Sequence, residues 1–168
     1  MRLMRVSVFV GVTIDGFLAR VDGSFDFLTP FQEDHGFTEF WKSVDALVIG
    51  RETYETVLAF PDWPYGKKRL VVLTHRPIDA RHGETTHSGE LAPLCERLRA
   101  EGVGRVYLDG GVTVQQGLDE GIVDDMTITF VPRTIGIGRR LFPGGKPCTN
   151  AWTLAGSQQY ASGLVQVR

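Results

Sequence analysis

Gly50, Arg51 and Thr53 have the types and spacing that could bind a phosphate group. Gly50 ends an apolar run that is typical of a buried strand, and a helical pattern begins at the next residue. The first amides of a helix are unpaired and carry a partial positive charge, and an arginine can fork onto phosphate oxygens. Taken alone, this segment favours the simpler interpretation of a surface arginine on an ordinary strand-to-helix turn.

Thr74, His75 and Arg76 follow the next predicted strand along the chain. A hydroxyl, an imidazole and a guanidinium at one strand end could hold a 2′-phosphate, the group that distinguishes NADP from NAD. A polar turn fixed by Pro77 is the alternative, and for this segment alone it is the simpler one.

Gly110, Gly111, Val112 and Thr113 join a further apolar strand to a helix. A pair of glycines allows a pyrophosphate to approach the backbone closely, whereas a tight turn would need only one. The chain contains neither the G-x-G-x-x-G nor the G-x-x-x-x-G-K-[ST] pattern. Three such segments, each after a predicted buried strand, nevertheless favour a dinucleotide site over three unrelated turns.

A sheet with parallel strands must position these segments, because the carboxyl ends of parallel strands meet at one edge. The alternation of apolar strands and 3.6-residue helical patterns predicts an α/β three-layer sandwich with a mostly parallel central sheet and antiparallel C-terminal strands. Residues 15–30 form the longest stretch without a regular pattern. The predicted strands cover residues 6–10, 45–50, 69–74, 105–108 and 125–131, the helices cover 33–43, 51–58, 89–100 and a segment after Gly111, and a hairpin covers 152–159 and 162–168.

Composition limits the class of protein. The 168 residues suggest one domain over 1–168, and 18 basic against 20 acidic residues give a net charge of −2, which argues against nucleic-acid binding. No apolar run is long enough to span a membrane, and no signal peptide is evident. Cys95 and Cys148 form no disulfide framework and have no metal-ligand spacing, so we expect a cytoplasmic protein without a metal.

The chain resembles the dihydrofolate reductase-like superfamily over nearly its whole length, and most resembles the riboflavin biosynthesis reductase domain (the RibD C-terminal domain) and its small stand-alone relatives. The segment 6–19 resembles the first strand of the family and the mobile loop after it. The segment 48–54 resembles its Gly-Arg-x-Thr cofactor motif, and 73–77 and 108–111 resemble its 2′-phosphate and Gly-Gly pyrophosphate segments.

The resemblance implies NADPH as the cofactor. Gly11 and Leu18 would then flank the nicotinamide, and the loop over residues 15–24 would close over the site. The residues that would hold the phosphates and the adenosine ribose are Gly50, Arg51, Thr53, Thr74, His75, Arg76, Gly110, Gly111, Val112 and Thr113. The riboflavin-type relatives also suggest a homodimer.

Asp34 is the first candidate for the carboxylic acid that would protonate a substrate, with Asp26 as the runner-up and Glu33 behind both. The alternative for each is a carboxylate that stabilises a helix N-terminus. The pattern around Asp34 departs from that of dihydrofolate reductases. We therefore expect an NADPH-dependent reductase of a small heterocyclic or ribosylaminopyrimidine-type substrate. A non-catalytic NADP(H)-binding protein and a true dihydrofolate reductase are the alternatives.

Overall fold

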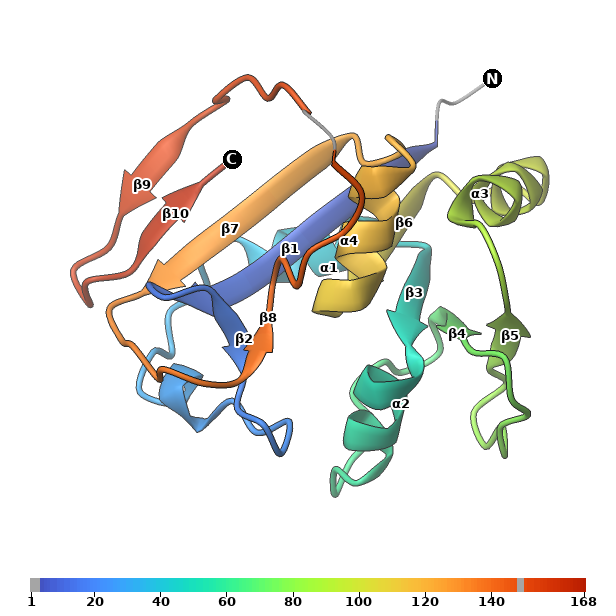
Figure 1. The fold of residues 1–168 in the computed structure, drawn as a ribbon, viewed down its shortest axis with the longest axis horizontal. Coiled ribbons are helices and arrows are strands. Elements are labelled where there is room, and N and C mark those ends of the chain that lie inside the picture. Colours follow the sequence, from blue (N-terminus) through green and yellow to red (C-terminus); the bar gives the residue numbers. More distant parts are fainter. Residues whose placement is uncertain (1–3, 148–149) are drawn as a thin grey trace.

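The computed structural model describes residues 4–147 and 150–168, so Cys148 lies outside the described residues. An eight-stranded sheet runs through it in the order β5-β4-β3-β6-β1-β7-β10-β9 (Figure 1). Its strands are β1 (Arg5–Thr13), β3 (Ala46–Gly50), β4 (Arg69–Leu73), β5 (Thr85–His87), β6 (Arg105–Asp109), β7 (Asp125–Val131), β9 (Ser157–Gln159) and β10 (Val165–Val167). The first six of these in space pair in parallel, and β10 runs antiparallel to both β7 and β9.

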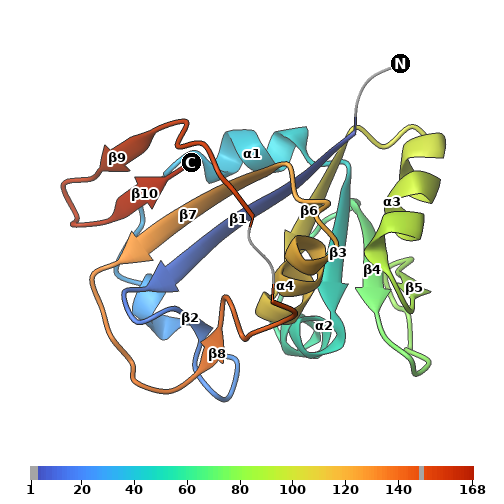
Figure 2. The same ribbon diagram turned by 45° about the horizontal axis from the view of Figure 1, so that its top comes forward.

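Helices cover both faces of the parallel part of this sheet. The helices α1 (Phe37–Ser43) and α2 (Arg51–Leu58) pack on one face, and α3 (Leu91–Ala100) and α4 (Gly111–Asp119) pack on the other. Figure 2 shows the β9–β10 hairpin at one edge of the sheet and β4 and β5 at the other. The predicted α/β sandwich, with its mostly parallel sheet and antiparallel C-terminal strands, is confirmed.

The central strands are apolar throughout because both of their faces are buried. In β3, Val48 points to the layer of α3 and α4, whereas Leu47 and Ile49 point to the layer of α1 and α2. All three side chains are fully buried. Cys95 packs in the same core from α3, as its position on the apolar stripe of that helix predicts. No helix of the described residues is long and apolar enough to cross a membrane.

Three sequence expectations need correction. The helix predicted over 33–43 begins only at Phe37, because Gly36 has a φ of 90°, in the left-handed region where a helix does not continue. The stretch 15–30 is not wholly irregular, since it contains β2 (Phe17–Ala19) and a 3₁₀ helix (Asp26–Leu28). The strands β2, β5 and β8 (Arg139–Arg140) were missed, because segments of two or three residues have no readable periodicity.

Candidate functional site

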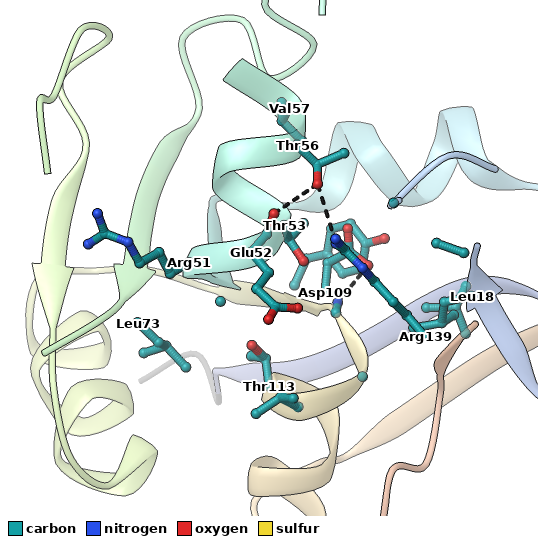
Figure 3. Close-up of a pocket in the computed structure, with 18 of the residues that line it drawn as sticks. Leu18, Arg51, Glu52, Thr53, Thr56, Val57, Leu73, Asp109, Thr113 and Arg139 are labelled. Carbon is teal, nitrogen blue, oxygen red and sulfur yellow. Dashed lines mark hydrogen bonds between the residues drawn. The ribbon is translucent and has the colours of Figure 1, made fainter. Parts of the chain in front are cut away.

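A cavity of about 1100 Å³ opens at the carboxyl ends of the parallel strands (Figure 3). Residues at the ends of β3, β4, β5 and β6 line it, together with residues of β1. The short strand β2, which pairs with β8 in a separate two-stranded sheet, closes one side. The fold therefore brings together segments that lie as far apart in the chain as Phe9 and Pro143.

Eleven of the twelve residues predicted to bind the cofactor line this one cavity. They are Gly11, Leu18, Gly50, Arg51, Thr53, Thr74, His75, Gly110, Gly111, Val112 and Thr113. Figure 3 shows Thr53 and Thr113 on either side of the space between α2 and α4. Each of the three motifs could be explained separately as an ordinary turn. Their position around one cavity favours a shared binding site.

Arg76 is the one predicted residue that does not line the cavity. Its exposed backbone instead helps to hold Arg51, whose Nη1 lies 3.4 Å from the Arg76 carbonyl oxygen, 3.2 Å from that of Pro77 and 3.1 Å from the Thr74 hydroxyl. The Arg51 Nε donates to Glu55 at 2.7 Å. Of these two arginines, Arg51 is therefore the one that lines the cavity.

The starts of the four helices differ in how their amides are satisfied. Asp34 accepts hydrogen bonds from amides at the start of α1, and the Glu120 carboxylate accepts the amides of Leu91 and Ala92 at the start of α3. At the cavity, α2 and α4 begin after Gly50 and Gly110 with no side-chain cap. Their first amides are left for a bound anion.

Both glycines of the Gly-Gly pair are required by the fold itself. Gly110 has a φ of 92°, and a Cβ there would lie 2.7 Å from the Thr53 hydroxyl oxygen. A Cβ on Gly111 would overlap the backbone carbonyl oxygen of Arg140. The backbone of β8 thus lies so close to Gly111 that no side chain fits there. This contact explains the glycine without a bound pyrophosphate.

The three carboxylates that the sequence put forward as proton donors all lie off the cavity. Asp34 accepts hydrogen bonds from the amides of Gly36 and Thr38, at 3.1 and 3.2 Å, and hydrogen bonding from Thr38 lowers its pKa. Asp26 pairs with Arg20, and Glu33 accepts from the hydroxyl of Ser162. None of the three lines the cavity. The geometry gives Asp34 the alternative role of stabilising a helix N-terminus.

We expect Asp34→Ala to lower the thermal stability of the protein. The substitution removes the acceptor for the amides at the start of α1. Loss of such an N-terminal cap should lower the melting temperature by roughly 2–4 °C. Thermal unfolding checks this. Asp34→Asn keeps an acceptor oxygen and should melt near the parent protein, so equal losses in both variants would contradict a capping role.

Asp109 is the carboxylate that the structure does place in the cavity. It ends β6, and its Oδ1 accepts the Gly110 amide at 2.9 Å, while its Oδ2 has no partner among the described residues. Burial raises the pKa of Asp109 above its ordinary value. In the sequence, Asp109 stands out only as part of the segment 108–111. The sequence did contain a signal that could have identified it as a site residue. Asp109 is an ionisable residue that ends an apolar strand directly before Gly110 and Gly111.

Other lining residues were also missed. Glu52 points into the cavity from the first turn of α2, and Arg139 reaches across from β8 to donate to the Thr56 hydroxyl at 3.3 Å (Figure 3). Tyr65 and Tyr107 line the cavity beside Asp109. They belong to segments without a recognisable motif, so only the folded chain brings them together.

Within residues 4–147 and 150–168 there is no group of three or more His, Cys, Asp or Glu side chains that could hold a metal ion. His82 stacks on Trp63, with ring centroids 4.0 Å apart. His35 and His87 line the cavity.

A parallel sheet with helices on both faces and a cavity at its carboxyl edge is typical of ligand-binding α/β proteins. The chain belongs to the RibD C-terminal domain family, whose model matches residues 5–166. The resemblance inferred from the motifs is therefore confirmed.

Two Bacillus subtilis (strain 168) proteins are similar to this chain, and both are described as uncharacterized. YwjB is 33% identical over 140 residues, which are 80% of each chain, and YyaP is 23% identical over 97% of this chain and 93% of its own. A crystal structure from Shewanella sp. PV-4, assigned to riboflavin biosynthesis, has a TM-score of 0.88 with 34% identity over 98% and 97% of the two chains.

The fold is also that of larger enzymes. Acinetobacter baumannii RibD has a TM-score of 0.70 at 15% identity, and the match covers 99% of this chain and 57% of that one. A Thermotoga maritima diaminohydroxyphosphoribosylaminopyrimidine deaminase/5-amino-6-(5-phosphoribosylamino)uracil reductase has a TM-score of 0.69 at 11% identity, over 98% of this chain and 55% of its own. At these identities the likeness concerns the fold.

Proposed function

We propose that the protein is an NADPH-dependent reductase of a small heterocyclic substrate. The observation that carries the proposal is the convergence of two uncapped helix N-termini and the ends of β3, β4, β5 and β6 on one cavity. At about 1100 Å³ the cavity exceeds the roughly 300–1,000 Å³ that a single small ligand needs. A cofactor and a substrate can therefore share it, as hydride transfer requires.

The residues of the cavity fit a dinucleotide. The first amides of α2 and α4, after Gly50 and Gly110, would hold its phosphates, with the Thr53 and Thr113 hydroxyls beside them. Arg51 and Thr74 would read the adenosine ribose phosphate. Leu18, from β2, would cover the nicotinamide.

NADPH, when bound, supplies the hydride, so the protein must provide position and a proton. Asp109 would provide the proton, because its carboxyl lines the cavity and its raised pKa favours the protonated form. The alternative of a non-catalytic binding protein was motivated by the altered region around Asp34. A carboxyl inside the cavity supports a catalytic function over that alternative.

Cofactor choice should depend on Arg51 more than on Arg76. We expect Arg51→Gln to weaken NADPH binding about tenfold or more and NADH binding much less, because a charge-assisted hydrogen bond to the 2′-phosphate is lost. Arg76→Gln is the matched control, since its side chain does not line the cavity. Tryptophan fluorescence during titration with each cofactor measures both constants. A larger loss in Arg76→Gln would contradict the assignment.

The test of the function itself has two parts. NADPH binding is measured first by the same titration, and NADPH oxidation is then followed with pterin and ribosylaminouracil-type substrates. No binding at millimolar NADPH would overturn the proposal. Tight binding with no turnover across the panel would favour the non-catalytic alternative.

A further inference from the structure

Arg139 carries a positive charge that no carboxylate of the described residues pairs with. Its half-buried side chain lines the cavity from β8 and reaches across to α2, where Nη1 lies 3.3 Å from the Thr56 hydroxyl oxygen (Figure 3). Within the part of the chain that the structure describes, this hydroxyl is the one hydrogen-bond partner of the guanidinium. Glu52 and Asp109 also line the cavity, but neither forms an ion pair with Arg139. Since a guanidinium has five N–H donors, most of them remain available to a ligand.

The other two arginines that line the cavity already have partners. Arg51 pairs with Glu55 at 2.7 Å and also donates to the turn after β4. Arg140 holds its guanidinium over the Phe17 ring, with Cζ 4.7 Å from the ring centroid. Arg139 is therefore the arginine of the cavity whose charge neither a carboxylate nor an aromatic ring of the described residues compensates. It can bind an anionic ligand without breaking an ion pair.

Contacts on either side hold Arg139 in place. In β8, the carbonyl oxygen of the next residue, Arg140, lies so close to Gly111 that a Cβ there would overlap it. The guanidinium lies against the loop that follows β2, because a Cβ on Gly23 would be 3.2 Å from Nη1 and 2.9 Å from the Thr56 hydroxyl oxygen. The side chain is thus held between this loop and α2 before any ligand binds. A group that is already ordered loses less conformational entropy on binding.

The guanidinium lies close to the helix starts that would hold the cofactor phosphates. Thr53 and Thr56 are three residues apart, so they lie on one face of α2, about one helical turn from each other. The Thr53 hydroxyl oxygen would be 2.7 Å from a Cβ on Gly110, directly before α4. The Thr56 hydroxyl accepts from Arg139. Arg139 therefore lies roughly 5 Å from the Gly-Gly turn, and an arginine side chain covers that distance by changing rotamer.

We propose that Arg139 binds the diphosphate of the cofactor, together with the first amides of α2 and α4. The guanidinium exchanges the Thr56 hydroxyl for phosphate oxygens. The assignment rests on the proposed function and adds to it a residue that lies outside the three nucleotide segments. The diphosphate is common to NADPH and NADH, so Arg139 serves both cofactors, whereas Arg51 distinguishes them.

Removal of the charge tests the assignment. The Arg139→Gln variant of the full chain is titrated by calorimetry with NADPH, NADH and adenosine 2′-monophosphate, which has the 2′-phosphate but no diphosphate. We expect both dinucleotides to bind about tenfold or more weakly, as loss of a charge-assisted hydrogen bond predicts, and the monophosphate to change by less than about twofold. Arg51→Gln should instead weaken NADPH and the monophosphate and spare NADH. The same pattern in both variants would overturn the assignment.

Two further variants separate ligand binding from a structural role in holding β8. Thr56→Val removes the hydroxyl that holds Arg139 but keeps the charge, so dinucleotide affinity should stay within about twofold of that of the parent protein. Arg133→Gln removes the same charge at a residue outside the cavity and should also leave affinity unchanged. A loss in either variant as large as that in Arg139→Gln would overturn the assignment.

A phosphate could also reach Arg139 on a substrate instead of on the cofactor. A ribosylaminouracil and its 5′-phosphate are therefore titrated into the parent protein and into Arg139→Gln, both with saturating NADP⁺. We expect the ratio of the two affinities to be the same in both proteins. A ratio that changes by about tenfold, with dinucleotide affinity unchanged, would assign the guanidinium to the substrate and overturn the assignment to the diphosphate.

Failure of this assignment and failure of the proposed function give different results. Every constant is measured by heat and needs no hydride transfer. NADPH binding that depends on Arg139, without turnover of any substrate, would overturn the reductase and keep the assignment. Turnover with NADPH affinity unchanged in Arg139→Gln would keep the reductase and overturn the assignment.

Discussion

Asp109→Asn is expected to lower the rate of substrate reduction by about 10²-fold or more and to leave the NADPH dissociation constant within about twofold. The amide keeps the size of the carboxyl and can keep the 2.9 Å bond from the Gly110 amide. It cannot deliver the proton that reduction of a heterocycle requires, and proton transfer by a placed side chain accounts for about 10²–10⁴-fold in rate. Single-turnover oxidation of NADPH measures the chemical step directly.

Asp34→Asn is the matched control, because it makes the same chemical change at the carboxylate that the sequence favoured. Its rate should stay near that of the parent protein, since Asp34 lies off the cavity and bonds the start of α1. A rate loss in Asp34→Asn with none in Asp109→Asn would restore the prediction made from the sequence.

The pH dependence provides a second check on Asp109. A proton donor works only while protonated, and burial raises the pKa of Asp109, so the protonated form persists to a higher pH than for an ordinary aspartate. The rate should be highest below this raised pKa and should fall as the pH rises through it. Asp109→Asn should lack that decline, and a parallel decline in both proteins would argue against the role.

Gly111→Ala is expected to destabilise the protein by about 2–3 kcal/mol, which is the upper range for forcing an extra carbon into a packed site. The new Cβ would overlap the Arg140 carbonyl oxygen, which is backbone and cannot rotate away. The melting temperature should fall by roughly 5–10 °C. The cause would be displacement of β8 from the start of α4, whether or not a cofactor is present.

Gly156→Ala is the control for this change. Gly156 has no neighbouring atom within 4 Å of the added Cβ, and its φ is not in the left-handed region. Its melting temperature should stay near that of the parent protein. If Gly111→Ala were equally harmless but lost NADPH binding, the glycine would serve the cofactor and the explanation from β8 would be wrong.

The sequence by itself determined the α/β architecture and pointed to eleven residues that line the one cavity. Apolar strands such as β3 and β4 are recognisable locally because both faces of a central parallel strand are buried. Parallel pairing then brings their carboxyl ends to one edge, so Gly50, Thr74 and Gly110 could be grouped without knowing a single contact. Periodicity and topology carry that information.

Only the tertiary structure decided which charged side chains face the cavity. Asp34 and Asp109 are both aspartates next to a helix, but one bonds the amides of α1 and the other ends β6 inside the cavity. Arg51 and Arg76 were both predicted for the cofactor, but only Arg51 lines the cavity, and the turn after β4 presents its carbonyls to Arg51. The direction of a side chain depends on contacts between segments far apart in the chain, and local sequence patterns do not encode those contacts.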